Sequence, residues 1–169
     1  MPDAADEEKQ ALLYFLDYQR NSVLSIVGGL DEKAWHTPAV PSGWTVAGLV
    51  EHLGYAERHW FQQVVTGSEI DLPWDEGRPA YDPHAALTCG RPSADVLAYY
   101  RQQCERSNEV LARTPLLAPP LGRHGGPDED QPPNLRWIAL HVIEETAAHS
   151  GHLEIARELL DGQTDLGLR

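Results

Sequence analysis

The sequence predicts an all-α fold, a four-helix bundle with long loops between the second and third helices and between the third and fourth. Four segments of about 20 residues repeat their apolar side chains with the period of an α-helix. No run of β-branched residues alternates with polar ones over more than a few positions, so strands are not expected. The chain of 169 residues suits one domain, residues 1–169, with a substantial core.

Capping residues bound the expected helices. Gly28 and Gly29 end the first helix, because glycine accepts the left-handed conformation at a helix C-terminus. The N-cap positions hold side chains that accept hydrogen bonds from the free amides of a first turn: Asp31, Thr45, Ser93 and Asn134. The expected helices are Asp6–Gly28, Thr45–Val65, Ser93–Arg113 and 135–160, with a short turn at 30–35 and a stop at Gly162.

The composition disfavours two classes of partner. The formal net charge is −13, which disfavours nucleic acid and anionic membranes, because both bind through surplus lysine and arginine. The acidic N-terminus, MPDAADEEKQ, does not resemble a signal peptide, and no apolar run approaches the roughly 18 to 20 residues of a membrane span. Two cysteines, Cys89 and Cys104, are expected to be free thiols, so we predict a cytoplasmic protein.

The last helix carries four polar residues on one face: His141, Glu145, His149 and His152. Helical spacing puts them at roughly 0°, 40°, 80° and 20° around the axis. The same arc holds the apolar residues Ile138, Val142, Ile155 and Leu159, so we expect this face to be buried. Burying a carboxylate and three imidazoles is costly unless something pairs with them. A bound divalent metal explains the cluster best, and a buried polar network is the alternative.

The second helix offers a further ligand. His52 shares its apolar side with Leu49, Leu53, Ala56 and Trp60 and should point into the bundle, where facing helices build metal sites. We predict a metal site of His52, Glu145 and His149, with an open position for water or substrate. His141 and His152 either orient these ligands or replace Glu145 as a ligand.

The remaining histidines and tryptophans are given no chemistry. Glu144 is expected at the surface, about 100° from Glu145 around the helix. The tryptophans Trp44, Trp60 and Trp137 are expected in the core. No role is predicted for His36, His59, His84 and His124. The sequence contains no phosphate-binding loop, no dinucleotide-binding glycine motif and no H-E-x-x-H motif.

Two segments resemble the DinB/YfiT family of metal-binding four-helix bundles. GWTVAGLVEHLGYAERHWF, residues 43–61, is similar to the second helix of that family, and LRWIALHVIEETAAHSGHLEIARELLDG, residues 135–162, to its last helix. The resemblance implies a divalent metal held by one histidine of the second helix, here His52, and two residues of the last helix at i and i+4, here Glu145 and His149. Most members have histidine at both positions. Glutamate at the first resembles the mycothiol-dependent maleylpyruvate isomerase branch.

The resemblance implies a function as well. Members include transferases and isomerases that use mycothiol, bacillithiol or glutathione, so we expect a metal-activated thiolate that attacks a small electrophilic substrate. Zinc is the expected metal, with nickel, iron and manganese as alternatives. Two other functions stay open: a metal-dependent hydrolase that uses metal-bound water, and a non-catalytic stress-response or binding bundle. A homodimer is plausible for such a bundle.

The two long loops, 68–92 and 114–133, are expected to form the mouth of the pocket. Their arginines carry the charge that a substrate carboxylate would meet, and the candidates are Arg78, Arg91 and Arg123.

Overall fold

A computed structural model describes residues 4–69, 71–76, 82, 84–126, 129–164 and 166. These residues form helices and loops, and no strand occurs among them. The long helices are α1 (Ala4–Val27), α3 (Val46–Glu57) with its continuation η1 (Arg58–Val64), α4 (Ser93–Arg113) and α5 (Leu135–Asp161). Two short helices, α2 (Glu32–Trp35) and η2 (Pro73–Asp75), lie in the connections. The predicted all-α bundle is confirmed.

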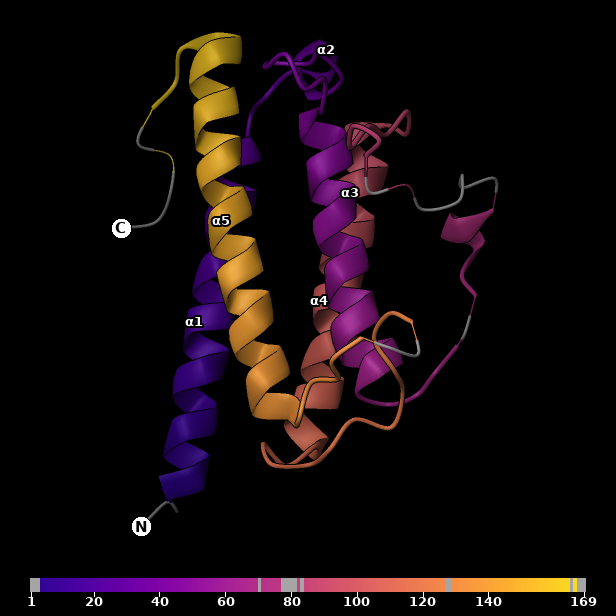
Figure 1. The fold of residues 1–169 in the computed structure, drawn as a ribbon. Helices are drawn as coiled ribbons and strands as arrows, with labels where there is room; N and C mark the ends of the chain where they lie inside the picture. Colours follow the sequence, from indigo (N-terminus) through magenta and orange to yellow (C-terminus); the bar gives the residue numbers. More distant parts are fainter. Residues whose placement is uncertain are drawn as a thin grey trace.

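The four long helices are arranged as two pairs (Figure 1). The chain's first and last helices, α1 and α5, pack side by side, and α3 packs on α4. The pairs meet along α3 and α5, which contact one another less extensively than the members of each pair do. Within the described ranges, no helix is long and apolar enough to cross a membrane.

Most predicted helix ends are confirmed. The Thr45 side chain accepts from the Gly48 amide at 3.1 Å, Asn134 accepts from Trp137 at 3.1 Å, and Gly162 has a left-handed φ of 78°. Ser93 does not cap α4 as predicted, because it is the first residue of that helix and follows Pro92. Its amide and hydroxyl instead donate to the Glu32 carboxylate, which brings a negative charge to the start of α4.

The second helix departs from a regular α-helix near its end. Residues Arg58–Val64 form a π-helix, in which each turn holds about one residue more than an α-turn. The widened turn lets the adjacent residues His59 and Trp60 face the same cavity, while Phe61 and Val64 stay fully buried. Such π-segments occur frequently at functional sites.

The buried face of α5 lies beside the predicted one. Ile155 and Leu159 are 57% and 60% exposed, so their predicted burial is wrong. The residues that do face the core are centred roughly a quarter of a turn or more further around the helix, and they are Leu135, Ile138, Val142, Thr146, Leu153 and Ala156. The polar stripe therefore runs along the border of the core, which leaves it accessible.

Candidate metal centre

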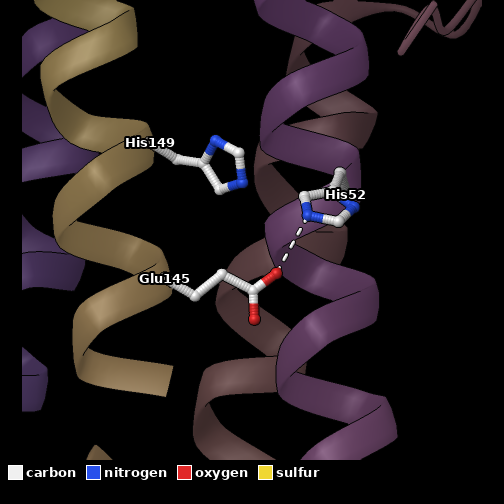
Figure 2. Close-up of side chains that lie close together, drawn as sticks. All are labelled: His52, Glu145 and His149. Carbon is white, nitrogen blue, oxygen red and sulfur yellow. Dashed lines mark hydrogen bonds and ion pairs between the residues drawn. The ribbon is translucent and has the colours of Figure 1, made fainter. Parts of the chain in front are cut away.

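His52, Glu145 and His149 converge between α3 and α5. Figure 2 shows Glu145 and His149 one turn apart on α5, both directed at the ring of His52 on α3. A hydrogen bond of 3.0 Å joins His52 Nε2 to Glu145 Oε1, and the rings of His52 and His149 lie 5.1 Å apart, edge to face. One ligand atom from each residue lies within 4.8 Å of the other two. In the part of the chain that the structure describes, this is the group of three that could hold a metal ion.

One carboxylate oxygen of the triad has no hydrogen-bond donor among the described residues. Glu145 Oε2 is buried and makes no hydrogen bond with the described residues, although its partner oxygen is bonded to His52. A buried carboxylate oxygen without a donor is costly, and a cation would relieve that cost. Two imidazole nitrogens and one carboxylate oxygen also form a donor set that suits zinc, nickel, iron and manganese. The residues present therefore fit a divalent metal.

The protonation states favour cation binding. Burial is the main cause, and electrostatic repulsion by the neighbouring His52 the second, of a lowered pKa of about 4 for His149. Its imidazole is therefore neutral at pH 7. Burial alone would raise the pKa of Glu145, but the His52 hydrogen bond and the electrostatic interactions with the neighbouring histidines outweigh it and lower this pKa. Neutral imidazole and ionised carboxylate are the forms that ligate metals.

His141 and His152 flank the triad. His141 Nε2 lies 3.5 Å from the free oxygen of Glu145, and the His141 ring stacks on Trp137 with centroids 5.3 Å apart. His152 Nδ1 lies 3.3 Å from His149 Nδ1, and His152 is exposed. Both histidines are thus next to the predicted ligands, outside the group of three.

A cavity of about 1010 Å³ opens beside the triad. Its walls come from α3 and η1, from α5 and from both long loops, and include Asp71 and Asp75 of the first loop and His124 and Glu129 of the second. The prediction that both loops line the pocket is confirmed. His52 and Glu145 belong to this wall.

A second cavity of about 290 Å³ lies at the other end of the triad. His149 and His152 form one side of it, and Trp44 and Leu49 line it as well. The rest of the wall is the segment 84–87 of the first long loop, together with Ser42.

A family model named mycothiol S-transferase matches residues 11–162. The chain belongs to the mycothiol S-transferase family. The match spans all four long helices except the first turns of α1, and it includes His52, Glu145 and His149. The predicted relationship to DinB-like bundles is confirmed by this membership. Among curated protein sequences, none matches the chain.

In this family member, the large cavity is also lined by residues for which the sequence predicted no role. His59 and His124 bond to one another at 2.9 Å, and His124 stacks on Trp60 with centroids 4.4 Å apart. Trp137, expected in the core, is 43% exposed at the cavity. The spacing of His59, seven residues after His52, was the one usable signal, because it places both on one helix face.

The loop that carries His124 docks on the end of η1. Leu121 and Gly122 donate their amides to the carbonyls of Val65 and Val64 at 3.1 and 2.9 Å. A Cβ at Gly122 would lie 2.4 Å from the Gln63 carbonyl oxygen, so only glycine permits this approach. This contact, which joins segments far apart in sequence, positions His124 over Trp60.

The two predicted arginines that the structure describes, Arg91 and Arg123, do not line the cavities. Arg91 stacks on Trp74 at 4.0 Å and donates to the Trp74 carbonyl oxygen. Neither Arg91 nor Arg123 is among the residues that line the two cavities, and Arg78 lies outside the described residues. The arginine that does line the large cavity is Arg58, which forms an ion pair with Asp75 at 2.7 Å.

Proposed function

We propose that this protein is a divalent-metal-dependent S-transferase or isomerase whose cosubstrate is a low-molecular-weight thiol of the mycothiol type. The observation that carries the proposal is the convergence of His52, Glu145 and His149 at the wall of a cavity large enough for such a thiol. Family membership supports mycothiol as the thiol. The second substrate is a small electrophile.

In this proposal, His52, Glu145 and His149 hold the cation, with zinc as the first candidate. When bound there, the cation would lower the pKa of a coordinating thiol, so that thiolate is present at neutral pH. Glu145 offsets part of the positive charge, and three protein ligands leave a position for the thiol. His141 and His152 restrict the rotation of Glu145 and His149 through the contacts described above.

A protein thiol is not needed as the nucleophile. Burial raises the pKa of Cys89 to about 11 and raises the pKa of Cys104 as well, so both are protonated at neutral pH. Neither cysteine is among the residues that line the two cavities. The reacting sulfur therefore belongs to the cosubstrate.

The large cavity contains an acceptor for the thiol proton. Burial lowers the pKa of His59, which keeps its imidazole neutral at pH 7. His59 Nδ1 contacts Gln63 at 3.2 Å and its Nε2 contacts His124 at 2.9 Å, so a proton taken up on this pair can pass to the loop and on to solvent. His59 is a base in this account and does not coordinate the metal.

The test uses full-length protein purified without a metal-affinity tag, stripped of metal with a chelator and then reloaded with Zn²⁺. Mycothiol and 1-chloro-2,4-dinitrobenzene are supplied, and the thioether product is measured. We expect turnover that requires both metal and thiol. In Glu145→Gln it should fall at least about 100-fold, because loss of a ligand costs more than the 10- to 100-fold loss seen when a residue that hydrogen-bonds to a ligand is replaced. Glu144→Gln, the exposed neighbour on the same helix, is the matched control and keeps full activity.

Other outcomes would reject the proposal in distinct ways. Hydrolysis of activated esters without any thiol would favour the metal-dependent hydrolase instead. Protein that neither retains Zn²⁺ nor consumes thiol would favour a non-catalytic bundle.

A further inference from the structure

The two cavities divide the metal-candidate triad between them. His52 and Glu145 line the large cavity and His149 lines the small one, and no residue lines both. A molecule in each cavity would therefore approach the triad from a different end. A group transfer needs two substrates to meet at one point, and the triad borders both cavities.

We propose that the small cavity, lined by Trp44, Leu49, Leu87 and His149, is the binding site of the electrophile, and that the thiol occupies the large cavity. This inference rests on the proposed transferase function. The occupant of the small cavity is a compact apolar or aromatic molecule with one reactive carbon.

Volume is the first argument. Sites for drug-sized ligands measure about 300–1,000 Å³, so the cavity of 290 Å³ admits a single-ring molecule and the cavity of 1010 Å³ admits a much larger one. Mycothiol carries a cysteine on two linked six-membered rings and exceeds the small cavity. The large cavity is left for the thiol.

The chemistry of the walls agrees with the volumes. The small cavity combines the apolar sides of Trp44, Leu49 and the segment 85–87 with the side chains of Ser42 and three histidines, and no carboxylate is among its described lining residues. The large cavity presents carboxylates that accept hydrogen bonds from hydroxyl groups, among them Asp71 and Glu129, and the exposed part of the Trp137 side chain. The carboxylates of the large cavity suit the hydroxyl groups of a polyol, and the small cavity, without them, suits an aromatic electrophile.

The transfer that follows is a substitution. The thiolate sulfur attacks the electrophilic carbon, a carbon–sulfur bond forms, and the bond from that carbon to the leaving group breaks. The leaving group departs with the bonding pair, as chloride from 1-chloro-2,4-dinitrobenzene. The proton originally on the thiol goes to solvent.

Kinetic variants test this assignment. Ala86 is exposed and lines the small cavity, so Ala86→Phe fills that cavity at little cost in stability. We expect at least a 10-fold higher KM for 1-chloro-2,4-dinitrobenzene and an unchanged KM for mycothiol. Trp137→Ala in the large cavity should raise the KM for mycothiol and leave the KM for 1-chloro-2,4-dinitrobenzene unchanged. Ala98→Phe, on the exposed side of α4, is the control and changes neither constant.

A binding measurement keeps the test independent of turnover. The unreactive 2,4-dinitrotoluene quenches tryptophan fluorescence on contact, and we expect saturable quenching that is lost in Trp44→Phe and retained in Trp137→Phe. Quenching lost in Trp137→Phe instead, or a raised mycothiol KM in Ala86→Phe, overturns the assignment while leaving the transferase function intact. Absence of turnover in the wild type with quenching through Trp44 would reject the transferase and keep the small-molecule site.

Discussion

Two carboxylates lie between helices of this bundle, and their surroundings differ. Glu57, the last residue of α3, accepts from Arg20 of α1 through both oxygens at 2.7 Å, and its side chain is 2% exposed. Glu145 has one oxygen bonded to His52 and one without a hydrogen bond, and its side chain is 19% exposed. The first cluster is closed and complete. The second, open cluster is partly exposed and has one carboxylate oxygen without a hydrogen-bond donor among the described residues, which suits a ligand site.

The partners explain the difference. Arginine keeps its charge at all relevant pH values and offers donors in a fork that matches a carboxylate. The Arg20 guanidinium also donates to Asp17 and Asn108, so four of its five N–H groups are hydrogen-bonded to described residues. Histidine at the second cluster brings no permanent charge, and His149 is neutral at pH 7 because its pKa is lowered to about 4. In the proposed function an external cation completes the second cluster, whereas the first already has its counter-charge in Arg20.

The largest effect is expected at the open cluster. Replacing one ligand, as in His149→Ala, should abolish stoichiometric zinc binding and lower kcat/KM by roughly 1,000-fold, which corresponds to about 4 kcal/mol of transition-state stabilisation. Elemental analysis and steady-state kinetics measure these quantities. His36→Ala, which removes a half-buried histidine far along the chain from the triad, should change neither. Full metal content in His149→Ala would refute the site.

A substitution in the closed cluster should lower the free energy of unfolding. Glu57→Gln removes the buried counter-charge of Arg20, leaves it only the exposed Asp17, and should cost about 3–5 kcal/mol of unfolding free energy. Glu145→Gln in metal-free protein removes a carboxylate that has a hydrogen-bond donor on one oxygen only, and it should lower the unfolding free energy much less. Urea denaturation of both variants compares the two clusters directly. An equal loss in both would show that the open cluster is structural as well.

Much of the fold follows from local sequence signals, because helix periodicity and caps are local properties. Thr45, Asn134 and Gly162 mark helix ends where the structure places them. The i, i+4 spacing of Glu145 and His149 likewise fixes their common face, and His52 follows from the apolar side of its helix. Long-range features do not follow: Arg20 pairs with Glu57 across 37 residues, and His124 reaches Trp60 through the docking of Gly122. The π-turn at Arg58–Val64 has no sequence signature in this chain.

Binding of a metal ion should stabilise the folded protein by a smaller amount. A cation that binds the folded protein alone stabilises it by about 2.7 kcal/mol when present at 100 times its dissociation constant. The thermal midpoint of wild-type protein should therefore rise with added Zn²⁺, and that of Glu145→Gln should not. Differential scanning calorimetry at matched ionic strength measures both. A similar rise in the two proteins would place the bound metal elsewhere.

The smallest effect is a pH dependence of metal-free protein. The pKa of His149 is lowered from 6.5 to about 4 on folding, so the unfolded chain takes up a proton that the folded one excludes. The contribution of His149 to the free energy of unfolding is therefore fully present above about pH 6.5, and it is lost progressively as the pH falls from about 6.5 to about 4. Because His149 is half-buried, solvent screening reduces the effect. His149→Gln should flatten this part of the stability profile, and an unchanged slope would show that other groups produce it.

The most direct test of the central claim is the absorption spectrum of cobalt-loaded protein during titration with mycothiol. If His52, Glu145 and His149 hold a divalent cation with an open position, one equivalent of Co²⁺ should give visible ligand-field bands. Mycothiol should then add a sulfur-to-cobalt charge-transfer band in the near ultraviolet at neutral pH. Both signals should be lost in His149→Ala. Wild-type protein that binds Co²⁺ without developing the charge-transfer band, or that does not bind it at all, would contradict the account.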